Sequence, residues 1–367
     1  MTQKIYILSH VSEHTTAHSF ARAFSEKNIS YHYYDRIDDL SILLPADILF
    51  LVDPVVAWPI GLEEVNCKII AYFIDVHLEL GLRMQQAQFA DIVFIAQKDY
   101  VNEFKEAGIL NVHWMPLAFD PYLLSKELIQ NGRSIDLGFI GKLGRPGSRR
   151  FEVLSKCLGA FKSNDYLTYT PPRQMIKIYQ RSKIVINASI KGDLNMRVFE
   201  AMGAGALLIT DRIENGLTEL FSEGVHYIGY SELEEAQENI AIYLADEQLR
   251  VKISNEGTKL VMANHLYWNR WISMMHIHSN SNPVRTVSNF SEQRVRKITL
   301  EVLIALRSPK EFMKVIGRYG FHYEVIRYFF LSNLRLLNTV IPITPNALIK
   351  RFELLLGRSK KKDYEFK

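Results

Sequence analysis

The sequence contains only two cysteines, Cys67 and Cys157, among 367 residues. Neither belongs to a CxxC pair or lies beside a histidine, so the pattern predicts no zinc site and two reduced thiols. The chain also lacks a run of about twenty uncharged apolar residues, which a membrane-spanning helix would need. Its first residues run directly into a strand-like segment and show no signal-peptide pattern. We therefore expect a cytoplasmic protein.

Hydrophobic residues make up 48% of the sequence and charged residues 23%, which is the balance of a folded globular protein. The net charge of +4 is unevenly distributed: residues 291–362 carry +10 and residues 1–290 carry −5, counted from the sequence. The chain thus consists of an acidic body and a basic tail. The acidic body and the lack of a recognised binding module argue against nucleic acid as a partner.

Short apolar segments of strand length alternate with helical segments along the first 276 residues. The first series comprises strands at residues 4–9, 48–52, 68–73, 92–95 and 112–115, with a helix at 17–26. A second series begins with a strand at 136–140 and continues with a helix at 149–161, a strand at 184–187, a helix opening at 197–202, a strand at 206–210 and helices at 232–245 and 247–265. Such alternation predicts an α/β fold with two Rossmann-like, doubly wound domains facing a cleft. We assign residues 1–130 and 131–276 to these domains.

The composition changes after residue 276. Residues 276–290 are polar and predict a loop, and amphipathic helices follow within a helical extension at 277–367. From Phe312 to Ile341 the apolar residues keep helical spacing along one stripe, with basic residues on the opposite side. Such a helix can lie on an anionic membrane surface. The alternatives are packing on the body of the protein and contact with a partner protein.

One segment of the second series carries the clearest chemical signal. Residues 195–211 read NMRVFEAMGAGALLITD, with Arg197 and Glu200 in the first turn of the expected helix. A helix N-terminus offers free N–H groups and the positive end of the helix dipole, which suit a pyrophosphate. A carboxylate one turn further along can accept hydrogen bonds from both hydroxyls of a ribose.

This segment resembles the donor-binding signature of GT-B-fold glycosyltransferases, most closely the branch of the spore-maturation (CgeB-like) glycosyltransferases with its R-x-F-E-x-x-x-x-G pattern. The resemblance covers residues 135–275 in order and includes DLGFIGK at 136–142, SKIVIN at 182–187, FSEG at 221–224, YSEL at 230–233 and H-x-Y-x-x-R at 265–270. The N-terminal half is a weaker match, carried mainly by FIDVH at 73–77, ADIVF at 90–94 and WMPLAFD at 114–120.

The resemblance implies that Glu200 binds the donor ribose and that Arg197 contacts the diphosphate. The donor site further includes Gly141 and Lys142, which follow the first strand of the second domain, and Gly203, where the backbone packs closely. The alternative for Arg197 and Glu200 is a surface ion pair on a helix.

Many retaining members of the family have a second glutamate eight residues before the ribose-binding one. This sequence has Gly192 at that position, with Asp193 beside it. Asp193 can substitute for the glutamate with a shift of one residue. The sequence therefore leaves both the sugar contacts and the retaining or inverting outcome open.

The acceptor side is predicted in the first domain. Asp75 and His77 follow the strand at 68–73, and the carboxyl end of a parallel strand faces the ligand crevice. The resemblance places a functional Asp or His here, and either can serve as general base for the acceptor hydroxyl. The alternative for Asp75 is a cap on the following helix. In the first loop, His14 is the candidate acceptor contact.

His14 also belongs to a series with His10 and His18, spaced so that a helix would place all three on one face. A metal site is the alternative for this loop. We expect no metal, because the family generally needs none.

We therefore expect a glycosyltransferase that moves a sugar from a nucleotide-sugar donor to a glycan or lipid-linked acceptor, in bacterial surface-glycoconjugate synthesis. The donor is a substrate, so no cofactor is expected. The basic tail at 291–362 would place the enzyme peripherally on the inner face of the plasma membrane. The alternatives are a nucleotide-sugar epimerase of the same fold and a catalytically silent GT-B scaffold at the membrane.

Overall fold

The computed structural model describes residues 3–55, 58–126, 132–164, 169–281, 285–306, 312–320 and 325. The chain divides into two compact units. Unit 1 comprises residues 1–56 and 61–289, and unit 2 comprises residues 57–60 and 290–367. Unit 1 holds both of the sheets that the structure describes.

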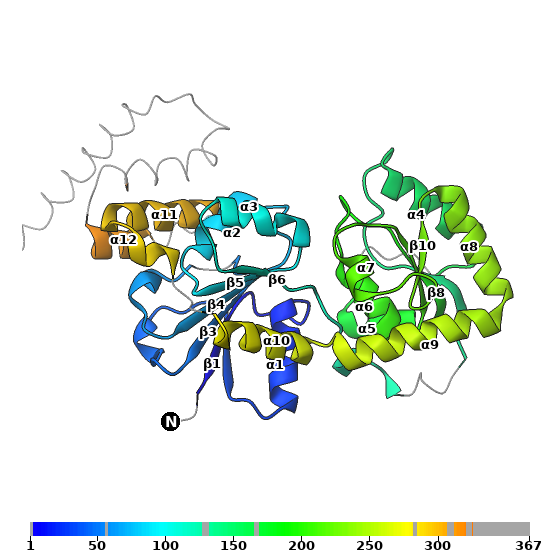
Figure 1. The fold of residues 1–367 in the computed structure, drawn as a ribbon, viewed down its shortest axis with the longest axis horizontal. Helices are drawn as coiled ribbons and strands as arrows, with labels where there is room; N and C mark the ends of the chain where they lie inside the picture. Colours follow the sequence, from blue (N-terminus) through cyan, green and yellow to red (C-terminus); the bar gives the residue numbers. More distant parts are fainter. Residues whose placement is uncertain are drawn as a thin grey trace, which may run out of the picture. The chain divides into compact units, whose positions relative to one another are not determined.

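The first sheet of unit 1 has six parallel strands in the order β2-β1-β3-β4-β5-β6. Their bounds are Tyr31–Tyr34, Ile5–Leu8, Ile48–Val52, Lys68–Phe73, Ile92–Ile95 and Val112–Trp114, respectively. Helices α1 (Thr16–Glu26) and α10 (Tyr267–Ser279) cover one face, and α2 (Leu80–Ala87) and α3 (Val101–Glu106) cover the other (Figure 1). The strand order reverses between β1 and β3, as in a doubly wound sheet.

The second sheet has four parallel strands in the order β10-β9-β8-β7. These are Ile228–Tyr230, Leu207–Asp211, Ser182–Asn187 and Ile135–Gly138. One face packs on α4 (Arg149–Ala160) and α8 (Leu233–Ala245), and the other on α5 (Pro172–Arg181), α6 (Met196–Gly203) and α9 (Glu247–Asn264). Alternate residues of β8 supply the two faces: Ile184 and Ile186 lie in one core and Val185 in the other.

Short helices complete unit 1. They are α7 (Leu217–Leu220) and the 3-10 turns η1 (Leu40–Ile42), η2 (Leu62–Glu64), η3 (Lys98–Tyr100), η4 (Pro121–Leu123) and η6 (Thr286–Asn289). Side-chain caps set where three of the longer helices begin: Thr15 accepts from the His18 N–H, Ser148 from the Phe151 N–H and Asp246 from the Leu249 N–H.

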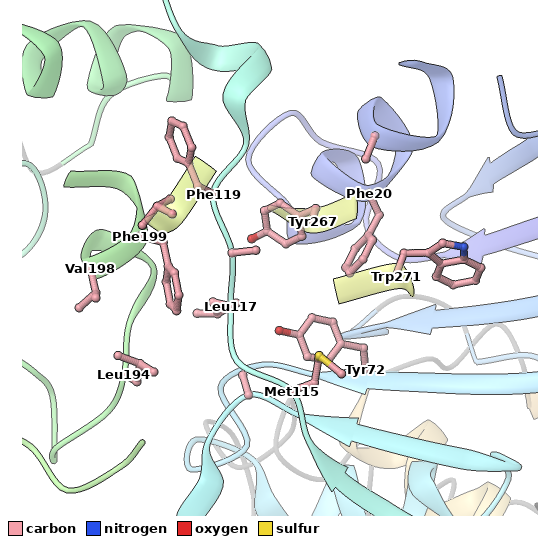
Figure 2. Close-up of a cluster of buried hydrophobic side chains, with 14 of the residues drawn as sticks. Phe20, Tyr72, Met115, Leu117, Phe119, Leu194, Val198, Phe199, Tyr267 and Trp271 are labelled. Atoms are coloured by element: carbon pink, nitrogen blue, oxygen red, sulfur yellow. The ribbon is translucent and has the colours of Figure 1, made fainter. Parts of the chain in front are cut away.

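A shared core joins the two halves of unit 1. Figure 2 shows Met115, Leu117 and Phe119 on the segment after β6, between side chains of α6 and of α10. The backbone of Phe119 pairs with the segment before α10, its N–H donating to the His265 carbonyl at 2.8 Å. Helix α10 then packs on α1, where the Trp271 ring lies 4.9 Å from that of Phe24. The chain thus returns to the first sheet after completing the second.

The strands and helices predicted within residues 1–275 are confirmed to within about two residues at each end. The sequence analysis gave no bounds for β2, β10, α2, α3, α5, α7 or α10. It was also wrong to expect a loop throughout residues 276–290: α10 continues to Ser279, and η6 covers Thr286–Asn289. The physical reason for the longer helix is burial, because the side chains of Met274 and His278 pack inside the protein. The domain division at residues 130 and 276 stays a prediction.

Unit 2 contains α11 (Glu292–Ala305) and α12 (Phe312–Tyr319). Of the apolar stripe predicted at 312–341, residues 321–324 and 326–341 lie outside the described residues. Within the described part, Val315 and Val325 are fully buried. No helix in the described ranges has the length and apolarity needed to span a bilayer. Membrane binding by the tail stays a prediction.

Gly203 at the end of α6 provides a test of the shared core. A Cβ atom added here would lie 2.4 Å from the Phe119 ring, which is itself fully buried. We predict that Gly203→Ala lowers the free energy of unfolding by about 1–3 kcal/mol, because the core must shift to admit the methyl group.

The matched control is Gly159→Ala in α4, where nothing lies within 4 Å of an added Cβ. Alanine there should leave stability unchanged or raise it by up to about 1 kcal/mol, since glycine disfavours a helix. Urea unfolding of the two variants measures both effects. Equal stability of the two variants would contradict the packing at Gly203.

Candidate functional site

The carboxyl ends of both sheets contribute to one cavity of about 480 Å³ within unit 1. Six of the predicted site residues line it: His14, Asp75, Lys142, Asp193, Arg197 and Glu200. Three do not: His77, Gly141 and Gly203. The structure therefore brings together charged groups from segments far apart in the sequence.

The N-terminus of α6 opens into this cavity. Its N-cap residue, Asn195, makes no side-chain hydrogen bond to the first turn and instead donates to Asn187 Oδ1 at 3.2 Å. Asn195 and Met196 both line the cavity. The first N–H groups of α6 are therefore not capped by the N-cap side chain, and the positive end of the helix dipole faces the cavity. This arrangement suits an anion.

Arg197 lies in the first turn of α6 and is held in one orientation. Its guanidinium donates to Asn187 Oδ1 at 2.7 Å, to the Ile140 carbonyl at 2.6 Å and to the Tyr179 hydroxyl at 3.2 Å, and it lies 4.5 Å from the centre of the Phe139 ring. These bonds use three of its five N–H groups. The other two can donate to a phosphate.

Glu200 lies one turn after Arg197, with only 8% of its surface exposed. Burial raises the pKa of its carboxyl group to about 7, although the positive charge of Arg197 acts in the opposite direction. Because Glu200 is buried and Arg197 is bonded to three other groups, the two do not form the surface ion pair that was the alternative interpretation. A nearly buried carboxylate at a cavity wall is suited to accept hydrogen bonds from a ligand.

Gly141 and Gly203 act on the site through packing. Gly141 has a φ of +134°, and a Cβ atom at this position would lie 2.7 Å from Arg197 Nη2. Only glycine lets the loop after β7 pass this close to the guanidinium. Gly203 lies against Phe119, away from the cavity. The neighbouring residue, Lys142, lines the cavity.

The segment after β4 carries Asp75 to the cavity from the first sheet. Side chains at the ends of the adjacent strands hold this segment: Asp53 accepts from the Ile74 N–H at 3.3 Å, and Gln97 from the Val76 N–H at 3.4 Å. Asp53, with a left-handed φ of 42°, also pairs with Arg83 at 2.8 Å.

Asp75 itself is exposed, and helix α2 begins without a side-chain cap from its N-cap residue, Glu79. The structure therefore gives no support to the alternative of Asp75 as a helix cap. Its carboxylate is accessible to a ligand in the cavity.

Asp193, from the loop after β8, and His77 lie close enough to interact electrostatically. Burial is the main reason that the pKa of Asp193 is raised, with His77 acting to lower it and Asp75 acting to raise it further. Asp193 also accepts a hydrogen bond from the Ile190 N–H. His77 is half-buried, and its Nδ1 has no hydrogen-bond partner in the described structure. His77 thus does not line the cavity, but it remains a candidate for proton transfer.

The three histidines of the first loop do not share a helix face. His10 and His14 precede α1, and only His18 lies within it. Within the described ranges, no group of three or more His, Cys, Asp or Glu side chains is arranged to hold a metal ion. His14 lines the cavity, and its Nε2 shares a hydrogen bond with the Tyr169 hydroxyl from the second half of unit 1.

The structure adds basic residues that the sequence analysis missed. Arg150, in the first turn of α4, lines the cavity, and its guanidinium donates to the Lys142 carbonyl at 2.9 Å. Burial, followed by the nearby charge of Arg197, lowers the pKa of Arg150 to about 10. Arg22 of α1 also lines the cavity and pairs with Asp120 at 2.5 Å. The sequence signal for Arg150 was its place at a helix start after a glycine-rich loop.

Comparison with known proteins agrees with this arrangement. Residues 138–276 match the family model described as glycosyl transferase-like. Among the curated proteins, none matches this chain in sequence. The matched family segment contains most of the cavity residues described above and all of α6.

Solved structures resemble the fold of the chain at low sequence identity. HepE of Anabaena, in complex with UDP and glucose, has a TM-score of 0.53 at 12% identity and covers 77% of this chain and 100% of its own. An alpha-glucosyltransferase, in complex with UDP-glucose and DNA containing an abasic site, has a TM-score of 0.54 at 12% identity, with coverages of 76% and 100%. The UDP-forming α,α-trehalose-phosphate synthase of Burkholderia vietnamiensis has a TM-score of 0.51 at 10% identity, with coverages of 76% and 99%.

At these identities the similarity establishes the fold, and the CgeB-like branch stays a prediction. The two parallel sheets, their shared core and the cavity at their carboxyl ends agree with the fold expected from the sequence. Unit 1 therefore has the GT-B fold of glycosyltransferases, and its residues 138–276 match a glycosyl transferase-like family.

Proposed function

We propose that this protein is a glycosyltransferase that transfers a sugar from a nucleotide-sugar donor to a glycan or lipid-linked acceptor. One observation carries the proposal. A nearly buried carboxylate, Glu200, and an oriented guanidinium, Arg197, stand one turn apart at the start of α6, on the wall of a cavity. The same helix lies within the segment that matches the glycosyl transferase-like family.

The donor would occupy the second half of unit 1. Glu200 accepts hydrogen bonds from the ribose hydroxyls, and the N-terminus of α6 and Arg197 receive the diphosphate. Lys142 and Arg150 add positive charge as the diphosphate leaves, which stabilises the transition state electrostatically. Asp193 contacts the sugar of the donor. The similar solved structures include complexes with UDP and with UDP-glucose, which makes a uridine nucleotide the first donor to examine.

The acceptor would approach from the first sheet. Asp75 is an exposed carboxylate that lines the cavity, and as general base it removes the proton from the acceptor hydroxyl as the new glycosidic bond forms. His77 supports this step, and His14 contacts the acceptor. The setting we propose is bacterial surface-glycoconjugate synthesis, with the basic tail at 291–362 bringing the enzyme to an anionic membrane.

A thermal-shift screen with UDP-, GDP- and dTDP-sugars tests donor binding, because a ligand that binds only the folded state raises the melting temperature. Release of the nucleotide, with or without an acceptor, then tests the reaction. The proposed function predicts stabilisation by at least one donor and slow donor hydrolysis in the absence of acceptor. A chain that binds no nucleotide-sugar, or that only epimerises the sugar it binds, contradicts the proposal.

Glu200 predicts a specific pH dependence. Burial raises the pKa of its carboxyl group to about 7, so the charged form that accepts hydrogen bonds from a ribose predominates only above that pH. We predict that nucleotide affinity falls as the pH decreases through 7, by up to about tenfold per unit. Calorimetric titration with UDP between pH 5.5 and 8.5 measures it.

Glu200→Gln is the matched variant, because glutamine has nearly the same shape as glutamate but no titratable carboxyl group. It should bind UDP about ten- to hundredfold more weakly at pH 8 and lose the part of the pH dependence that belongs to the carboxylate. Protonation of the nucleotide phosphate affects both proteins equally and cancels in the comparison. Identical pH profiles for the two proteins would show that Glu200 does not contact the nucleotide.

Asp75→Asn should reduce kcat by about a hundredfold or more while leaving donor affinity within about twofold, since a general base acts only in the transition state. The control is Asp35→Asn, which neutralises an exposed carboxylate just after β2 and should leave kcat unchanged. Normal turnover of Asp75→Asn together with loss of turnover in His77→Ala would assign the base to His77 instead.

Metal independence is a further prediction. Arg197, Lys142 and Arg150 surround the place proposed for the diphosphate and can neutralise it as it leaves. We expect turnover in excess EDTA to stay within about twofold of the untreated rate. Reversible loss of turnover on chelation, restored by Mg²⁺ or Mn²⁺, would refute this.

A further inference from the structure

A second and larger cavity, of about 920 Å³, lies beside the first one. All of its lining residues come from the second half of unit 1, between Lys142 and Tyr230. Its walls are the loop after β7, the start of α4, the loop after β8 and the ends of β9 and β10. Lys142, Arg150 and Ile190 line both cavities. A ligand in the larger cavity would therefore adjoin one in the smaller cavity.

The larger cavity is strongly basic. Five cations line it: Lys142, Arg145, Arg149, Arg150 and Lys191. One acidic residue, Asp211, also lines it, and its two oxygens accept from the Ser189 N–H at 2.9 Å and the Ser189 hydroxyl at 2.5 Å. No ion pair joins any of the five cations to a carboxylate within the described ranges. Arg149 donates to the Ser231 carbonyl, and Asp193 and Asp211 partly offset the charge of Arg150. The cavity nevertheless keeps an excess of positive charge.

Arg150 also has a hydrogen-bond donor without an acceptor. Its Nη1 is buried and has no hydrogen-bond partner among the described residues, whereas its Nε and Nη2 donate to the Lys142 carbonyl. A buried donor without an acceptor is costly, and an anion relieves that cost. Since burial and the charge of Arg197 already lower the pKa of Arg150, a negative ligand would stabilise both guanidinium groups.

The cations exceed what a nucleotide diphosphate needs. A diphosphate at the N-terminus of α6 would lie in the cavity lined by Arg197, Lys142 and Arg150. These three cations and the helix dipole can neutralise its negative charge. Arg145, Arg149 and Lys191 line only the larger cavity. Lys191 and Gly192 both have left-handed backbone conformations, with φ of 57° and 76°, which place the Lys191 side chain on a sharp turn beside this cavity.

We propose that the larger cavity is a second anion site, which binds a phosphate group that does not belong to the nucleotide. Arginine forks and a lysine point charge are the groups that recognise phosphate in proteins. The phosphate group comes either from a phosphorylated sugar-like substrate or from free inorganic phosphate. Because the larger cavity lies beside the donor cavity, this ligand would lie next to the nucleotide-sugar. It would not contact Glu200 or the N-terminus of α6.

The experiment is a calorimetric titration of the full chain with inorganic phosphate at low salt, first alone and then with UDP at saturation. A separate site predicts that phosphate still binds when UDP is present. Loss of phosphate binding at saturating UDP would mean that both ligands use one diphosphate site, and would overturn the proposal. UDP binding is measured in the same series, so failure of the proposed function appears as a lack of UDP binding and is distinguishable.

The double variant Arg145→Gln/Lys191→Gln tests the residues. It should weaken phosphate binding about tenfold or more and change UDP affinity by no more than about twofold, since neither side chain lines the smaller cavity. The control is Lys252→Gln/Lys259→Gln, which removes two exposed charges from α9. Its net charge equals that of the test variant. Equal phosphate affinity in the two double variants would overturn the assignment.

A third titration, with glycerol 3-phosphate, identifies the source of the phosphate. Tighter binding of the ester than of inorganic phosphate supports a phosphorylated substrate, and equal or weaker binding supports free phosphate as the ligand. In either case, the binding must be weakened in Arg145→Gln/Lys191→Gln and unchanged in Lys252→Gln/Lys259→Gln. Binding that is insensitive to both variants contradicts the site.

Discussion

The arrangement of unit 1 depends on one buried guanidinium, that of Arg270. Its N–H groups donate to the carbonyls of Pro116 and Leu117 at 2.8 and 2.9 Å, and to His265 Nδ1 at 2.9 Å. These acceptors belong to the two segments that connect the halves of the unit. Burying a charge is expensive, and burial lowers the pKa of Arg270 to about 10, but its hydrogen bonds and the Phe199 ring offset that cost. Arg270 and the two segments that it holds together form a joint between the halves of unit 1.

This joint influences which groups meet at the smaller cavity. It fixes the segment through Phe119 against the end of α6, and α6 carries Arg197 and Glu200. It also directs α10 back onto α1, where Tyr267 packs 5.0 Å from Phe20. Cavity residues from the first sheet, such as Asp75, then approach residues from the second. The geometry of the cavity thus rests in part on side chains that do not line it, such as those of Arg270 and Phe119.

Much of the fold could be predicted from the sequence, because buried parallel strands are short apolar runs. Strand β2, Tyr31–Tyr34, escaped because an edge strand of aromatic and polar residues lacks that signal. The place of Glu200 and Arg197 at the cavity could be predicted because both residues belong to one helical turn; their roles stay predictions. Arg150 was missed although it lies at a helix start after a glycine-rich loop, because its approach to Arg197 is visible only in the folded chain. The H-x-Y-x-x-R pattern at 265–270 was recognised, but its function as the joint became visible only in three dimensions.

Two basic groups of the smaller cavity, Arg150 and Arg197, lie close together in the folded chain. Arg150 and Arg197 both lie near the Phe139 ring, at 5.9 and 4.5 Å from its centre, so two like charges share one partly buried surface. Their repulsion raises the free energy of the unliganded state, and carbonyl and amide acceptors relieve it only in part. An anion removes the repulsion and gains hydrogen bonds whose donors are already oriented. Asn187, Ile140 and Gly141 restrain the Arg197 guanidinium, so an anion that binds there would not have to immobilise it.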